Sequence, residues 1–140
     1  MKRWYVVNTK AKEENKAASN LMRQGYEVYL PHFRKRRSHA RRIDFIKAPL
    51  FPKYLFIRID LETEQWAKVN STYGVNRLIS LGKRPTPVPD GVVETIQYRE
   101  DYSGYISLGR IYNFKKGDAI NVMAGAFIDH LGIFDRRDDD

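Results

Sequence analysis

The stretch Pro49-Leu50-Phe51-Pro52-Lys53-Tyr54-Leu55-Phe56-Ile57-Arg58-Ile59-Asp60 predicts a rigid turn that leads into a strand. Both prolines fix φ and lack an N–H donor, which restricts them to the start or the edge of a strand. Side chains from Tyr54 to Ile59 then alternate between two faces. One face is aliphatic and is predicted to be core: Leu55, Ile57 and Ile59. The other face begins with aromatics and ends in Arg58, so we expect it to be partly covered, with an apolar patch at Phe51 and Tyr54.

The composition of the chain favours a polyanionic partner. Its 140 residues are the length of one ordinary domain. Its 25 Lys and Arg exceed its 17 Asp and Glu, which indicates nucleic acid first and an acidic membrane surface second. Part of the excess lies in one short run: Arg34, Lys35, Arg36, Arg37, Arg41 and Arg42. The absence of cysteine excludes disulfides and thiolate metal sites. The N-terminal apolar run stops at Asn8, too early for a signal peptide or membrane span, so we expect a soluble cytoplasmic protein.

The first part of the chain predicts a strand, a helix and a second strand. Residues 4–7 are apolar on both faces, as in an inner strand. Residues 11–24 have helical spacing, with Thr9 as their cap and Gly25 as the expected terminating glycine. The buried stripe of this helix is predicted to be Ala11, Ala18, Leu21 and Met22. A second strand is predicted at residues 26–33. The basic residues 34–42 that follow have no apolar periodicity and predict a mobile hairpin tip.

The remainder predicts two more helices and a fourth strand. Residues 62–70 predict a short helix with Trp66 and Val69 inward, and residues 75–79 predict a strand. Asp90 is predicted to cap a third helix, whose apolar stripe is Val92, Val93 and Ile96. The order β-α-β-β-α-β-α predicts an α+β fold, in which a four-stranded antiparallel sheet is flanked by helices in a ferredoxin-like outline.

Several segments resemble the NusG family of transcription elongation factors. They are Trp4-Tyr5-Val6-Val7, the Pro49–Phe56 stretch, Gly74-Val75, and a tail, Gly117 to Phe127, that resembles the start of a KOW motif. The resemblance implies a NusG N-terminal-like domain at residues 1–100, a linker at 101–113 and a partial KOW hairpin at 114–140. Lys53 stands where general NusG proteins usually have glycine, and Gly125-Ala126-Phe127 replaces Gly-Pro-Phe. These departures favour a specialised RfaH-like paralogue.

The resemblance implies a transcription elongation and antitermination factor that binds the clamp helices of the largest subunit of bacterial RNA polymerase and suppresses pausing. The polymerase-binding patch then comprises Tyr5, Phe51, Tyr54 and Ile96. The residues that the resemblance implies for contact with the exposed non-template DNA strand are Lys10, Asn20, Arg23, Gln24 and Tyr73. The ring of Tyr73 could stack on an unpaired base. From the residues alone, the same helix face could be an ordinary solvated one, and the aromatics could be core. The basic run is a candidate for phosphate contact, or a solvated hairpin.

Binding without chemistry is the expected activity. His32, His39 and His130 lack ligand spacing, and the carboxylates are not paired with a nucleophile or histidine, so we predict no metal, no cofactor and no enzyme. Family partners such as a ribosomal protein or the termination factor Rho would require a complete C-terminal barrel, and we expect a monomer. The rival hypothesis is an RRM-like module that binds single-stranded RNA through Tyr5, Tyr54 and Phe56. The absence of glycine among residues 53–57 counts against it.

Overall fold

The computed structural model describes residues 1–80 and 82–106. The chain divides into two compact units. Of the described residues, the first unit comprises Met1–Leu30 and Phe51–Val88, and the second comprises Pro31–Leu50 together with residues 89–106. The predicted KOW hairpin and most of the predicted linker lie outside the described residues.

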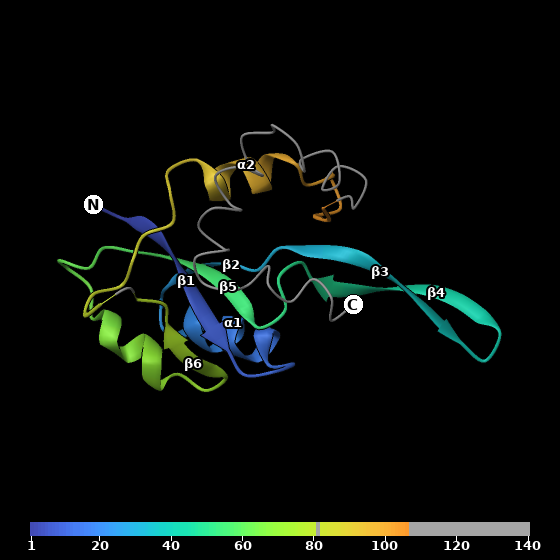
Figure 1. The fold of residues 1–140 in the computed structure, drawn as a ribbon, viewed down its shortest axis with the longest axis horizontal. Coiled ribbons are helices and arrows are strands. Elements are labelled where there is room, and N and C mark those ends of the chain that lie inside the picture. The colour runs from blue at the N-terminus through green and yellow to red at the C-terminus, as the bar shows by residue number, and fades with distance from the viewer. Residues whose placement is uncertain (81, 107–140) are drawn as a thin grey trace. The chain divides into compact units, whose positions relative to one another are not determined.

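The first unit contains a four-stranded antiparallel sheet (Figure 1), as the sequence predicts. Its strands lie in the order β2 (Glu27–Tyr29), β5 (Tyr54–Ile59), β1 (Arg3–Thr9) and β6 (Val75–Leu78). The most apolar strands, β1 and β5, occupy the centre, because only there do strands have a neighbour on each side and cover on both faces.

One face of this sheet packs under the helix α1 (Glu14–Arg23). Leu55, Ile57 and Ile59 are buried on it, so the predicted core face of the organising strand is confirmed. From α1 the buried residues are Glu14, Ala17, Ala18 and Leu21. The predicted stripe was wrong at Ala11 and Met22, which are exposed. Ala11 lies in the turn before the helix. Met22 follows the buried Leu21 and points to the outer surface of the helix.

Both predicted side-chain caps are wrong. Thr9 is the last residue of β1, and its hydroxyl donates to the carbonyl of Lys10 (3.1 Å). Helix α2 (Val92–Tyr98) is preceded by Gly91 at φ 88°, and Asp90 makes no capping bond to it. The predicted apolar stripe of α2 is confirmed, since Val92, Val93 and Ile96 are buried. The predicted helix at 62–70 is a 3-10 helix, η1 (Trp66–Ser71), with Val69 buried and Trp66 packed against the core.

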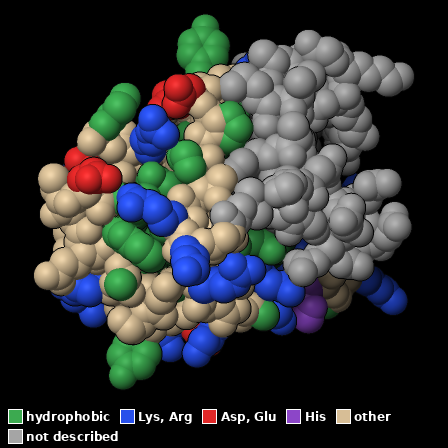
Figure 2. All heavy atoms as spheres, turned by 60° about the vertical axis from the view of Figure 1, so that its left-hand side comes forward, with side chains coloured by type: hydrophobic (Ala, Val, Ile, Leu, Met, Phe, Trp, Pro, Cys, Tyr) green, Lys and Arg blue, Asp and Glu red, His purple; other side chains and the backbone are tan. Residues whose placement is uncertain are grey.

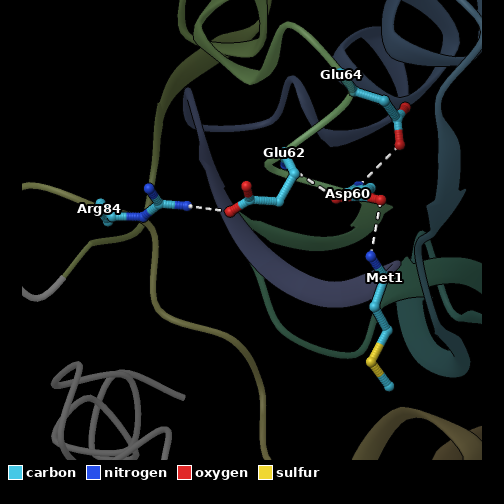
Figure 3. Close-up of polar contacts among 5 residues, drawn as sticks. All are labelled: Met1, Asp60, Glu62, Glu64 and Arg84. Atoms are coloured by element: carbon cyan, nitrogen blue, oxygen red, sulfur yellow. Dashed lines mark hydrogen bonds and ion pairs between the residues drawn. The ribbon is translucent and has the colours of Figure 1, made fainter.

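A polar network fixes the chain just after β5 (Figure 3). Asp60 accepts hydrogen bonds from the Met1 ammonium (2.8 Å) and from the backbone N–H of Glu62 (2.9 Å). Its own backbone N–H donates to Glu64 (2.8 Å), and Arg84 pairs with Glu62 (3.6 Å). The bond from the Met1 ammonium holds the pKa of Asp60 below its usual value. The network joins the start of β1 to the end of β5, in agreement with the antiparallel register of the two strands.

The second unit contains a long two-stranded ribbon, β3 (His32–His39) and β4 (Arg42–Pro49) (Figure 1). The predicted hairpin is confirmed, but its tip is Ala40 and Arg41 and not the whole of residues 34–42, because the ladder continues without a break to the His39–Arg42 pair. The predicted strand at residues 26–33 is likewise divided between β2 and β3, with Pro31 between them. At the base of the ribbon the N–H of Ile106 donates to the carbonyl of His32 (2.8 Å).

Among residues 1–80 and 82–106, no helix is long and apolar enough to cross a membrane.

Candidate functional site

The sheet face opposite α1 carries a row of aromatic rings, here called the aromatic face. Its rings come from β1, β2, β5 and the turn before β5, and they are Trp4, Tyr29, Phe51, Tyr54 and Phe56. Successive ring centroids lie 6.4 Å apart for Trp4–Tyr29, 6.2 Å for Tyr29–Phe56 and 6.1 Å for Phe51–Phe56. Such distances are within the range of favourable aromatic pairs. The aromatic face is therefore a layer of packed rings across three strands. Trp4, Tyr54 and Phe56 in it are buried, and only Tyr29 and Phe51 are partly exposed.

The turn that presents Phe51 is tightly constrained. The N–H of Tyr54 donates to the carbonyl of Phe51 (3.0 Å). Lys53 adopts φ 74°, its N–H donates to the carboxylate of Glu14 (2.8 Å), and its carbonyl accepts from the N–H of Thr9 (2.7 Å). Phe51 is half-buried and Tyr54 is 9% exposed, so Phe51 is the more accessible of the two predicted anchors.

The other two predicted polymerase-binding residues are placed differently. Tyr5 pairs with Ile57 and lies in the core with α1, on the opposite side of the sheet from Tyr54. Burial raises the pKa of Tyr5. Ile96 is buried on α2, in the second unit. The structure thus brings Phe51 and Tyr54 together and separates Tyr5 from them. It also corrects the RNA-binding hypothesis at Tyr5, which cannot share a stacking platform with Tyr54 and Phe56 because it lies on the opposite face of the sheet.

A second surface is built where the loop before β6 meets the end of α1, and we call it the helix–loop surface. Its members are Lys10, Asn20, Arg23, Gln24 and Tyr73, all predicted from the sequence to contact DNA. Asn20 donates to the carbonyl of Tyr73 (3.2 Å), Arg23 donates to the side chain of Asn20 (3.1 Å), and Gln24 donates to the hydroxyl of Thr72 (2.8 Å). The N–H of Lys10 donates to the carbonyl of Gly74 (2.9 Å).

These bonds divide the helix–loop surface into supporting and exposed side chains. The amide groups of Asn20 and Gln24 hold the loop against α1, whereas Arg23 is exposed and Tyr73 is 78% exposed. Gly74 makes the close approach possible, because its φ is +92° and a Cβ there would lie 2.8 Å from the backbone nitrogen of Ala17. Tyr73 thus exposes its ring on a surface that also carries the exposed Arg23, and an exposed ring with a cation on the same surface suits contact with an unpaired nucleotide.

The basic ribbon is the third candidate surface. Arg34, Lys35, Arg36 and Arg37 lie on β3, Arg41 lies in the turn and Arg42 begins β4. Arg37 forms a two-pronged bond to Asp44, with Nε 3.1 Å from Oδ1 and Nη2 2.8 Å from Oδ2. That bond holds the pKa of Asp44 below its usual value. The guanidinium of Arg34 lies 4.9 Å from the ring centroid of Tyr105.

Cations are widespread on the described surface. Figure 2 shows Lys and Arg side chains across much of the face in view, with hydrophobic side chains between them. The excess of positive charge predicted from composition is therefore presented to solvent, where it can attract a polyanion. In the described part of the chain, no cluster of three or more His, Asp or Glu could hold a metal ion.

Sequence reasoning missed several residues on these surfaces. Trp4 and Tyr29 belong to the aromatic face, but their strand patterns pointed only to an inner strand and an alternating strand. Phe45 and Lys47 lie on β4, a strand that was not predicted from the sequence. The alternation Ile43, Phe45, Lys47 against Asp44, Ile46, Ala48 was the available signal.

Comparison with known proteins identifies the family. Residues 2–97 match the family described as "Transcription termination factor nusG". The chain belongs to the NusG family. It is 28% identical to the transcription termination/antitermination protein NusG of Thermus thermophilus, over 92% of this chain and 79% of that protein. The corresponding NusG of Campylobacter jejuni is 25% identical over 97% of this chain and 81% of its own length.

Two further matches are partial. The NusG of Helicobacter pylori (strain J99) is 29% identical over 64% of this chain and 49% of that protein. A solved structure described as "Domain interaction in Thermotoga maritima NusG" has 26% identity and a TM-score of 0.44, and covers 66% of this chain and 54% of that one. The chain therefore spans about half the length of these two NusG chains. Family membership makes it a NusG-like transcription factor, and the narrower RfaH-like assignment stays a prediction.

Proposed function

We propose that this chain binds bacterial RNA polymerase through its aromatic face, at the clamp helices of the largest subunit. The match of residues 2–97 to the NusG family carries the proposal. Phe51 supports it physically, since it is a half-buried aromatic on a turn fixed by bonds to Glu14 and Thr9. A rigid aromatic anchor loses little conformational entropy on binding, which is why aromatics are frequent interface anchors.

Binding alone would be enough to change transcription. A factor that binds the closed clamp more tightly than the open one shifts the equilibrium toward closure, in proportion to the difference in affinity. A closed clamp would suppress pausing and favour elongation and antitermination. The proposal needs no catalytic residue, no cofactor and no metal.

The helix–loop surface is proposed to contact the exposed non-template DNA strand. Tyr73 would stack on an unpaired base, and Arg23 and Lys10 would contact phosphates. The exposure of Tyr73 and the bonds that hold its loop against α1 support this assignment. Asn20 and Gln24 would act mainly by holding the loop, because their amide groups already bond within the protein. Base-specific reading by these two residues is therefore secondary in the proposal.

Binding of the chain to purified bacterial RNA polymerase tests the first part. Phe51→Ala and Tyr54→Ala should each weaken binding at least tenfold, the effect of losing an anchor worth about 2 kcal/mol. Circular dichroism and a thermal melt would check that both variants remain folded. Tyr73→Ala is the matched aromatic control, since Tyr73 lies outside the aromatic face, and it should leave polymerase affinity unchanged.

Two results would contradict the polymerase proposal. One is wild-type protein that does not bind polymerase. The other is a folded Phe51→Ala variant that binds as well as wild type, which would show that the anchor is purely structural. Tyr73→Ala has its own readout, cross-linking to non-template DNA in an assembled elongation complex, where it should reduce the yield. An unchanged yield would remove the DNA part of the proposal and leave the polymerase part standing.

Rho, a ribosomal protein and the monomeric state stay predictions, because they depend on residues outside those described or on measurements in solution.

A further inference from the structure

We propose that one face of the β3–β4 ribbon is a binding platform for unpaired nucleotides, with Phe45 stacking on a base. Arg34, Arg36 and Lys47 on the same face would contact the phosphates. The platform would make the phosphate contact expected of the basic run more specific. It rests on the proposed function in one respect, that nucleic acid is the expected partner.

The register of the ribbon gives it two different faces. Paired residues in an antiparallel ladder point to the same side, and successive pairs alternate between sides. The first face carries the pairs Lys35–Ile46, Arg37–Asp44 and His39–Arg42. The second face carries the pairs Arg34–Lys47, Arg36–Phe45 and Ser38–Ile43. The basic run is thereby split, and its members do not act as one uniform patch.

Charge and exposure distinguish the second face. On the first face, the two-pronged bond to Asp44 satisfies the guanidinium of Arg37. The three pairs named for the second face hold three cations and no carboxylate. Its two apolar side chains are open to solvent, with Phe45 61% exposed and Ile43 56% exposed. They are two residues apart on β4, or about 7 Å, and so form one apolar strip bordered by cations.

This combination fits unpaired nucleotides better than a duplex. A duplex hides the flat faces of its bases and offers their edges, which are read by hydrogen-bonding groups. Phe45 and Ile43 have no such groups in their side chains. An unpaired base instead exposes a flat aromatic surface that can stack on a ring, while cations beside it track the backbone. The contact of Arg34 with the ring of Tyr105 (4.9 Å) orders one of those cations at the base of the ribbon.

Fluorescence anisotropy with the full chain tests the platform. The probes are labelled twelve-nucleotide oligothymidine and oligouridine, a duplex of mixed sequence, and phosphatidylserine–phosphatidylcholine vesicles. Phe45→Leu keeps apolar bulk and removes the ring, whereas Phe45→Tyr keeps the ring. We expect Phe45→Leu to weaken binding of at least one single strand fivefold or more, the lower end of measured stacking effects, and Phe45→Tyr to change it less than twofold.

Neighbouring residues supply the charge control. Arg36→Gln on the second face should reduce the slope of log affinity against log salt by about 0.7, the value for one contact to a single-stranded phosphate. Lys35→Gln removes the same charge one position away on the first face and should leave the slope unchanged. In Phe45→Trp, added oligothymidine or oligouridine should quench the new indole fluorescence, which reports stacking directly.

Three outcomes would overturn the inference. The first is equal single-strand affinity for wild type and Phe45→Leu. The second is a preference for the duplex, and the third is binding to vesicles but to neither single strand. Oligothymidine and oligouridine results decide whether the platform takes DNA, RNA or both. All three outcomes leave polymerase binding through Phe51 untouched, so failure of this inference is distinguishable from failure of the proposed function.

Discussion

At the scale of single residues, Lys53 shows how one backbone angle shapes the aromatic face. Its φ of 74° lies in the left-handed region, which costs a residue with a Cβ about 1–2 kcal/mol. The conformation is retained because both backbone groups of Lys53 form hydrogen bonds. Its N–H donates to the carboxylate of Glu14, and its carbonyl accepts from the N–H of Thr9. Lys53, which the resemblance sets against a glycine of general NusG proteins, thus occupies a position where glycine would be relaxed.

Lys53→Gly is expected to stabilise the chain. Relief of the left-handed strain should exceed the extra freedom that glycine gives the unfolded chain, for a net gain of about 0.5–1 kcal/mol. Chemical denaturation measures the free energy of unfolding. Lys53→Ala is the control, since it removes the ammonium but retains a Cβ, and it should leave stability nearly unchanged. A gain shared equally by both variants would mean that the charge, and not the angle, is responsible.

At the scale of elements, the packing of the loop before β6 on α1 decides whether the helix–loop surface exists. Gly74→Ala should disrupt it, because the added Cβ would meet the backbone of Ala17 at 2.8 Å and φ is +92°. We expect a loss of about 2 kcal/mol or more in the free energy of unfolding. Gly25→Ala provides a comparison, since φ is +96° there but no atom lies within 4 Å of the added Cβ. Its loss should be smaller, and an equal loss would show that contact with α1 is unimportant.

The ribbon offers a pH-dependent element. The hydrogen bond from Arg37 lowers the pKa of Asp44 in the folded ribbon below its ordinary value of 3.8. A lowered carboxyl pKa means that the pair's stabilising contribution is fully present above about pH 4 and is lost as pH falls through the folded pKa. An NMR titration of the Asp44 carboxyl carbon should give a midpoint below 3.8, and Arg37→Gln should move it upward. A midpoint that Arg37→Gln leaves unchanged would exclude the hydrogen bond as the cause.

At the scale of the whole molecule, the two surfaces proposed to bind nucleic acid belong to different units. The helix–loop surface lies in the first unit and the ribbon in the second. Because the two sites share no side chain, short single strands should occupy them independently.

Isothermal titration calorimetry with a six-nucleotide oligothymidine tests this independence. We expect wild type to bind two strands per chain. Tyr73→Ala and Phe45→Leu should each weaken one of the two sites and leave the affinity of the other unchanged, and the double variant should be weakened at both. A stoichiometry of one for wild type, abolished by either single substitution, would instead mean that both surfaces belong to a single site.

Local chemistry allowed the sequence to determine much of this protein. The alternation of Leu55, Ile57 and Ile59 places one face of β5 in the core, and the structure confirms it. Gly25 follows the end of α1, and the order of elements indicates the antiparallel sheet. The family could also be recognised, because the proline-bounded turn before β5 is a contiguous motif. These features depend on residues that are close together in the chain.

Only the tertiary structure decided the rest. A hairpin at the basic run was predicted, but its length was not. The ladder reaches the two-residue turn Ala40-Arg41, which has φ values of 50° and 69° and contains no glycine or asparagine to mark it. Pairing between strands separated Tyr5 from Tyr54, since a strand's register fixes which face each side chain takes. Tyr73 meets Asn20 across 53 positions, a contact that exists only because Gly74 lets a loop lie against a helix. Faces and surfaces are formed by residues far apart in the chain, so local sequence patterns could not specify them.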